Sequence, residues 1–182
     1  LARELGLTRP VLGDGPVTVE QGRHLPTEEL CSSLGAPYTP LDATFEPGPT
    51  VLFGSNMGGK TVVLKTLAFL QLAAQSGLFV PAARFATRVF RRVHYVGEGR
   101  SREEGRGLSG FGFEIRQLLE AHADFGDATL ALFDEFARTT SSGEAEAILS
   151  ALLEELSGRP NVVALFSTHF RGVRRLPGVR YL

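Results

Sequence analysis

A glycine-rich loop between a short apolar strand and a helix constrains this chain more than any other segment. Residues 54–61 read Gly-Ser-Asn-Met-Gly-Gly-Lys-Thr and fit the pattern G-x-x-x-x-G-K-[ST]. The β-type run Thr50–Phe53 precedes the loop, and apolar residues at helical spacing follow it from Lys60 to Ser76. This strand–loop–helix order is the context that the pattern requires, and it predicts an α/β fold.

The loop has the chemistry of a phosphate-binding site. Glycines let backbone N–H groups turn inward onto phosphate oxygens, and the positive end of the following helix points at the same place. In such a loop Lys60 reaches the β and γ phosphates, and the hydroxyl of Thr61 is a ligand for Mg²⁺. We therefore expect ATP to be bound by Gly54, Ser55, Asn56, Met57, Gly58, Gly59, Lys60 and Thr61.

Two acidic residues follow a second apolar strand. The run Thr129–Phe133 ends at Asp134 and Glu135, which is the Walker B pattern. At the strand's carboxyl end Asp134 would hold Mg²⁺, usually through water, and Glu135 would act as the general base on the attacking water. Taken alone, the pair is more often a solvated turn or a helix cap. Downstream of the phosphate-binding loop, the catalytic interpretation is favoured.

A histidine follows a third apolar strand. His169 comes directly after Ser167 and Thr168, where the run Val162–Phe166 ends. If this strand lies beside Thr50–Phe53, His169 could contact the γ-phosphate and sense its departure. The alternative is an ordinary histidine at a strand end.

Strand-type and helix-type segments alternate in the second half of the chain, which predicts a mainly parallel sheet. Helical spacing is clear in Phe111–His122 and in Ala145–Leu156, and an alternating strand is expected over Arg88–Val96. The proline-rich residues 22–49 are expected to be loop with short extended pieces. Strands are also expected over Val17–Glu20 and Val179–Leu182.

Composition excludes several classes of protein. A chain of 182 residues with net charge −1 and 43% hydrophobic residues suits one globular domain. The near-neutral charge argues against a freestanding, strongly basic nucleic-acid binder and leaves a local basic patch open. A single cysteine excludes a disulfide framework, and no apolar run is long enough to cross a membrane. We expect a cytoplasmic domain over 1–182, with a lead-in over 1–49 and a P-loop core over 50–182. Because the chain begins at Leu1, we expect it to be excised from a longer protein.

The loop and its neighbours resemble the ATPase domain of the MutS family. The five residues Asn56–Lys60 match the sequence that this family typically carries in its P-loop. Further segments resemble family motifs over most of the chain: Glu20–His24, Phe79–Ala82, Gly107–Phe111 with Glu114, Asp134–Ser141 and Ser167–Phe170.

The resemblance implies an ABC-type ATPase that works as a head-to-tail homodimer. Each composite site would use the P-loop of one subunit and the signature loop of the other, so Ser109 would approach the γ-phosphate bound by the partner. Ser109 could also be a plain helix cap. An aromatic residue before the P-loop strand stacks on adenine in the family; Tyr38 lies in the right region, but it could equally cover the edge of the core.

The match is incomplete on the proposed dimer face. Ala137 and Arg138 stand where the family usually has glycines, and Leu108 stands where its signature often has arginine. These departures suggest a divergent branch.

Three functions are compatible with these motifs. The first is a MutS-like ATPase whose Mg-ATP cycle drives a DNA-binding region outside this chain. The second is a MutS-like ATPase acting on a protein client, such as a reactivase of a cobalamin-dependent aminomutase. The third, a nucleotide-binding module with little turnover, is disfavoured because Glu135 supplies a base that such a module does not need.

Overall fold

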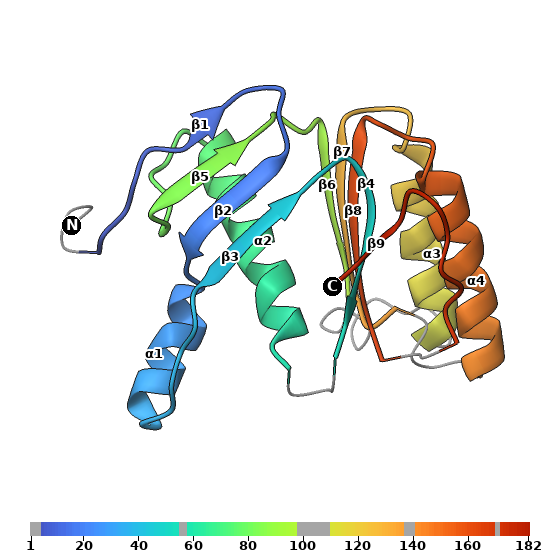
Figure 1. Ribbon diagram of the computed structural model, residues 1–182, viewed down its shortest axis with the longest axis horizontal. Coiled ribbons are helices and arrows are strands. Elements are labelled where there is room, and N and C mark those ends of the chain that lie inside the picture. Colours follow the sequence, from blue (N-terminus) through green and yellow to red (C-terminus); the bar gives the residue numbers. More distant parts are fainter. Residues whose placement is uncertain (1–4, 55–57, 98–109, 137–140, 170–171) are drawn as a thin grey trace. The chain divides into compact units, whose positions relative to one another are not determined.

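The computed structural model of the chain describes residues 5–54, 58–97, 110–136, 141–169 and 172–182 (Figure 1). The backbone divides into two compact units. The first contains residues 1–46 and 61–89, and the second contains residues 47–60 and 90–182. Each unit has its own sheet, and both sheets are accompanied by helices. The predicted α/β class, with a parallel sheet flanked by helices, is confirmed.

The first unit is built on a four-stranded mixed sheet with the order β1-β5-β2-β3. Its strands are β1 (Val11–Leu12), β2 (Val17–Gly22), β3 (Leu41–Phe45) and β5 (Arg84–Thr87). Strand β2 pairs antiparallel with both β3 and β5, whereas β1 pairs parallel with β5.

The helices of the first unit are α1 (Leu25–Ser33) and α2 (Lys60–Gln75). The first residue of α2, Lys60, belongs to the second unit. The predicted helix from Lys60 is confirmed, and its buried leucines Leu64, Leu67 and Leu70 repeat every three residues. A buried hydrogen bond of 2.6 Å from Thr87 Oγ1 to Gln71 Oε1 ties α2 to β5.

The expectation that residues 22–49 are loop with short extended pieces was wrong over Leu25–Ser33, which form α1 with Pro26 in its first turn. Strand β3 and the start of β4 are short extended pieces of the expected kind. Helix α1 has no buried residue, so it lacks the apolar periodicity that identifies a helix in sequence. Proline is well tolerated in the first helical turn, because N–H groups there have no partner within the helix.

The second unit is built on a five-stranded parallel sheet with the order β6-β7-β8-β4-β9. Its strands are β4 (Gly48–Phe53), β6 (Arg92–Val96), β7 (Thr129–Asp134), β8 (Val162–Thr168) and β9 (Arg180–Tyr181). Every residue of β8 is buried, as expected for a central strand of a covered parallel sheet. At one edge, Leu182 N donates to Val51 O and Leu182 O accepts from Phe53 N.

The predicted strand over Arg88–Val96 was wrong for residues 88–91. Strand β5 ends at Thr87 and belongs to the mixed sheet, whereas β6 begins at Arg92 in the parallel sheet. The intervening residues connect the two sheets.

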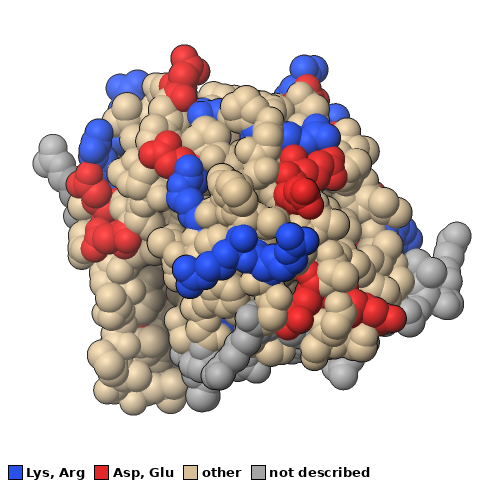
Figure 2. Space-filling model, turned by 45° about the vertical axis from the view of Figure 1, so that its right-hand side comes forward, with Lys and Arg blue, Asp and Glu red and all other residues tan. Residues whose placement is uncertain are grey.

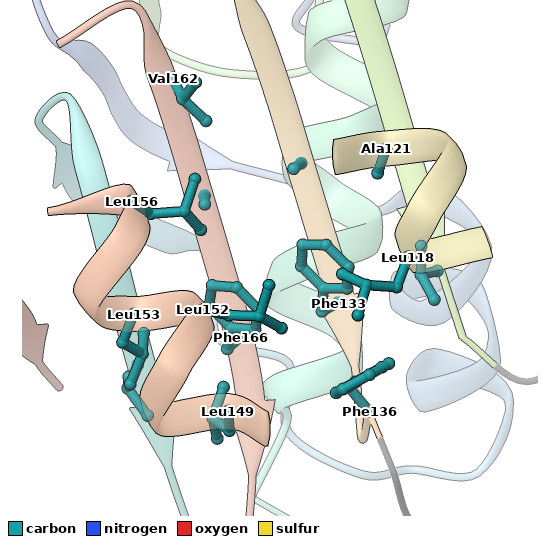
Figure 3. Packing of buried hydrophobic residues seen from close by; sticks show 14 of the residues in the cluster. Leu118, Ala121, Phe133, Phe136, Leu149, Leu152, Leu153, Leu156, Val162 and Phe166 are labelled. Carbon is teal, nitrogen blue, oxygen red and sulfur yellow. The ribbon is translucent and has the colours of Figure 1, made fainter. Parts of the chain in front are cut away.

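Helices α3 (Gly110–Ala123) and α4 (Ser142–Leu156) pack on the parallel sheet (Figure 1). Their apolar side chains meet β7 and β8 in one hydrophobic cluster, in which Phe133 and Phe166 stack with ring centroids 4.5 Å apart (Figure 3). The apolar stripe of α4 predicted from sequence is the buried face: Ala145, Leu149, Leu152, Leu153 and Leu156.

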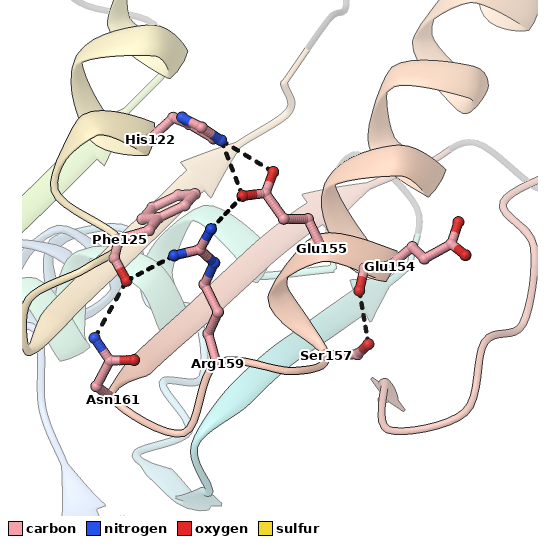
Figure 4. A network of polar contacts seen from close by, with 7 residues as sticks. All are labelled: His122, Phe125, Glu154, Glu155, Ser157, Arg159 and Asn161. Carbon is pink, nitrogen blue, oxygen red and sulfur yellow. Dashed lines mark hydrogen bonds and ion pairs between the residues drawn. The ribbon is translucent and has the colours of Figure 1, made fainter.

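A polar network joins the carboxyl ends of α3 and α4 (Figure 4). Glu155 accepts from His122 Nε2 at 2.9 Å and from Arg159 Nη2 at 2.6 Å. Arg159 and Asn161 also donate to the carbonyl of Phe125. These residues precede β7 and β8, so the network fixes the helices at the amino-terminal edge of the sheet. The opposite edge is left for the residues that follow the strands.

Candidate functional site

Three of the sequence motifs meet at the carboxyl-terminal edge of the parallel sheet. Phe53 is the register partner of Thr168, and Asp134 is the register partner of Ser167. The strands are parallel neighbours, so Gly54, Glu135 and His169 all leave the sheet at this edge. Ligands of open α/β sheets bind outside the carboxyl ends of the strands.

The described part of the glycine-rich loop contains Gly54, Gly58, Gly59 and Lys60. Ser55, Asn56 and Met57 lie outside the described residues. Lys60 is buried, with an exposed fraction of 7%, and its Nζ donates to Gly54 O at 2.7 Å. Gly59 has φ of 76°, a conformation open to glycine and strained for other residues. The loop therefore folds its one cation back over its own backbone. Thr61 follows as the next residue of α2 and is partly buried.

The carboxylate of Asp134 is held from both neighbouring strands. Ser167 Oγ on β8 donates to Asp134 Oδ1 at 2.8 Å. The hydroxyl of Tyr95 on β6 donates to Asp134 Oδ2 at 2.9 Å. Each carboxylate oxygen thus accepts an O–H group, and a carboxylate oxygen can accept more than one contact. Asp134 is a preoriented acceptor at the end of its strand.

Glu135 is placed by its backbone. Its N–H donates to Ser167 Oγ at 2.8 Å, and its φ is 51°. A non-glycine residue with positive φ is uncommon and is concentrated at functional sites. Ser167 therefore positions both members of the acidic pair.

Tyr95 and Gly97 are components of this site that the sequence interpretation missed. Burial, the negative charge of Asp134 and the hydrogen bond to it raise the pKa of Tyr95 well above its usual value, so the phenol stays a donor. A Cβ on Gly97 would lie 2.9 Å from Cβ of Asp134 and 3.1 Å from Cε1 of Tyr95. No sequence signal names either residue, because their partner lies on another strand.

The remaining predicted site residues are less fully placed. His169 is exposed directly after β8. Tyr38, in the first unit, is partly buried, and its hydroxyl accepts from the backbone N–H of His24 at 2.7 Å. Stacking of Tyr38 on adenine stays a prediction. Ser109 lies outside the described residues.

Arg84, Arg91 and Arg92 each form an ion pair with an acidic side chain. In the second unit Arg91 pairs with Asp127 at 3.7 Å and Arg92 with Asp124 at 3.3 Å. In the first unit Arg84 pairs with Glu20 at 3.0 Å. On the face drawn in Figure 2, a short band of basic side chains has acidic side chains above and below it.

None of the helices in the described ranges is long and apolar enough to span a membrane.

Residues 50–179 match the family model described as MutS domain V. A protein of Salinibacter ruber named DNA mismatch repair protein MutS is 34% identical over 93% of this chain and 19% of its own length. Its namesake in Caulobacter vibrioides is 33% identical over 96% of this chain and 20% of its own length. DNA mismatch repair protein MutS 2 of Halobacterium salinarum is 33% identical over 89% of this chain and 18% of its own length. The chain thus spans about a fifth of the relatives it matches. Matched by the domain V model over more than half of its residues, this chain belongs to the MutS family.

Proposed function

We propose that this chain binds ATP with Mg²⁺ and hydrolyses the nucleotide at the edge where β4, β7 and β8 end. One observation carries the proposal: the glycine loop with Lys60, the acidic pair and His169 leave neighbouring parallel strands at the same edge. A cation, a metal-binding carboxylate and a base are the parts that nucleotide hydrolysis requires.

Each residue has a distinct role in this proposal. The ammonium of Lys60 would leave the carbonyl of Gly54 and bind the β and γ phosphates. Asp134 would hold Mg²⁺, with Thr61 as the second ligand that the motif assigns. Glu135 would accept the proton of the attacking water. His169 would hydrogen-bond to the γ-phosphate.

The residues present suit magnesium. Mg²⁺ is usually held by one or two carboxylates together with substrate phosphates and water, so a dense cluster of ligands is not required. Within the described ranges, no group of three or more His, Cys, Asp or Glu side chains could form a metal site. The single, oriented carboxylate of Asp134 fits the sparse arrangement. When bound, Mg²⁺ neutralises negative charge on the phosphate oxygens.

We further propose an ABC-type arrangement, in which two chains close head to tail and Ser109 of each reaches the γ-phosphate held by the other. The family motifs support this arrangement, and the departures at Leu108, Ala137 and Arg138 support a divergent branch. Activity that needs two chains depends on concentration. The ATPase rate per chain should rise with protein concentration until dimers saturate, and Ser109→Ala should lower the plateau. A constant rate per chain over a wide dilution series, with the chain monomeric throughout, would contradict the dimer.

The cycle would drive a conformational change in a DNA-binding region outside this chain. The relatives carry the name of DNA mismatch repair proteins, which favours DNA over a protein client such as an aminomutase.

The decisive experiment is titration of the chain with a fluorescent ATP analogue in the presence of Mg²⁺. Lys60→Ala should abolish most of the binding, because it removes the buried cation of the loop. Lys65→Ala is the matched control, since Lys65 is an exposed lysine of the same helix. Equal affinity in wild type and Lys60→Ala would overturn the proposed site.

A further inference from the structure

The hydroxyl of Tyr95 donates a hydrogen bond of 2.9 Å to the Oδ2 atom of Asp134. Tyr95 lies on β6 and Ser167 on β8, the two strands that flank β7, so the carboxylate is gripped from opposite sides. A carboxylate held by one donor can still swing about its χ2 bond, whereas donors on both oxygens fix its plane. The arrangement therefore sets the orientation of the Asp134 carboxylate.

The absence of a side chain at Gly97 leaves room for the Tyr95 ring to lie close enough to Asp134 for its hydroxyl to form the hydrogen bond. Gly97 follows β6 without a side chain, and a Cβ there would collide with Asp134 and press tightly on the ring of Tyr95. The ring of Tyr95 is only partly buried. A phenylalanine would fill the same space, so hydrophobic packing alone does not require the hydroxyl.

We infer that Tyr95 is a positioning residue for Asp134, which it orients for a divalent cation bound with nucleotide. The inference rests on the proposed function, because it assigns the cation to Asp134. Groups that hydrogen-bond to a metal-binding side chain typically change metal affinity about 10–100-fold when removed. Since a carboxylate can accept several contacts, a hydrogen bond from Tyr95 is compatible with a cation on the same group.

The test measures binding of Mn²⁺, as a spectroscopic substitute for Mg²⁺, to the full chain with a non-hydrolysable ATP analogue. Free Mn²⁺ is quantified by electron paramagnetic resonance. We expect Tyr95→Phe to raise the Kd of Mn²⁺ about tenfold. Affinity for the nucleotide in excess chelator should stay unchanged, because the hydroxyl acts only through Asp134. A merely structural role would lower both affinities together.

Tyr181→Phe is the matched control. Its hydroxyl is hydrogen-bonded in the same unit, donating to Arg174 O and accepting from Leu176 N, and neither bond involves Asp134. This variant should leave the Kd of Mn²⁺ unchanged. Ser167→Ala removes the other donor to Asp134 and should also weaken Mn²⁺ binding.

The outcomes separate the two proposals. If wild type binds Mn²⁺ with nucleotide and Tyr95→Phe binds it within twofold, the positioning role is wrong and the proposed function stands. Tighter binding by Tyr95→Phe would mean that the phenol competes with the cation, and it would also overturn the inference. If wild type binds no Mn²⁺ with nucleotide, both the proposed function and the role of Tyr95 fail.

Discussion

Glu135 donates its backbone N–H to the hydroxyl of Ser167 at 2.8 Å, and the same hydroxyl donates to the carboxylate of Asp134. One serine on β8 thus fixes the backbone of one acid and the side chain of the other. Because Glu135 has φ of 51°, its side chain leaves the strand in a direction that extended backbone would not give. Asp134 and Glu135 are adjacent in sequence, but Ser167 bonds to the side chain of the first and to the backbone of the second.

Glu135→Gln should separate nucleotide binding from hydrolysis. The amide keeps the size of the side chain and the backbone bond to Ser167, but it cannot accept the proton of an attacking water. We expect affinity for Mg-ATP to stay within about twofold, while turnover falls by about 10²–10⁴-fold, the usual contribution of a general base. Single-turnover hydrolysis and nucleotide titration measure the two quantities. Turnover at the wild-type rate would rule out the base.

Gly97→Ala should destabilise the second unit. The added Cβ would lie 2.9 Å from Cβ of Asp134, so either the carboxylate or the strand end has to move. Overpacking of this kind costs about 1–3 kcal/mol of the free energy of unfolding, measured by urea denaturation. Gly126→Ala is the control, because a Cβ there meets no atom within 4 Å. Equal losses in the two variants would show that the tight approach of Gly97 is not the cause.

Leu153→Ala should test the core beneath the site. Leu153 on α4 is fully buried in the cluster with Phe133 and Phe166, so truncation leaves a cavity that costs about 2–5 kcal/mol. Leu119→Ala on α3 makes the same chemical change at a side chain with an exposed fraction of 61%. We expect that control to stay within about 0.5 kcal/mol of wild type. Both values come from urea denaturation.

The pKa of His24 should lie below its ordinary value of 6.5. Burial, and next the positive charge of Lys65, lower the pKa of His24. The folded state therefore favours the neutral ring. Its contribution to stability is complete above pH 6.5, the unperturbed value, and declines as the pH falls from there toward the lowered pKa. NMR of the ring protons gives the midpoint directly.

Lys65→Met should move that midpoint part of the way back toward 6.5, because burial is the larger cause and remains. A midpoint at or above 6.5 in the wild-type chain would contradict the prediction, as would a midpoint that Lys65→Met leaves in place.

The sequence was informative where burial imposes a pattern. Strands β7 and β8 are continuous apolar runs because helices cover the sheet they belong to, and α4 has a clear stripe because one of its faces is buried. Helix α1 buries nothing, so it left no periodic signal. The strand boundary at Arg92 was missed because the break reflects a change of sheet, which local alternation does not encode.

The candidate site likewise has parts that the sequence predicts and parts that it does not. Its linear motifs could be read because the loop 54–61 and the pair Asp134–Glu135 are contiguous in the chain. The bond from Tyr95 to Asp134 joins residues 39 positions apart, and it depends on β6 lying beside β7. Spacing along one strand cannot predict which residue of the next strand lies opposite.

The pairing of Leu182 with β4 has a mechanical consequence. Leu182 is hydrogen-bonded to Val51 and Phe53, and the ring of Tyr181 stacks on Phe53 with centroids 6.0 Å apart. Phe53 is the residue immediately before Gly54. A displacement of Leu182 would therefore strain the backbone at Phe53, one residue before the glycine loop. A displacement of the loop would in turn strain the hydrogen bonds of Leu182. The two points are 128 positions apart along the chain, yet force passes between them through one pair of strands.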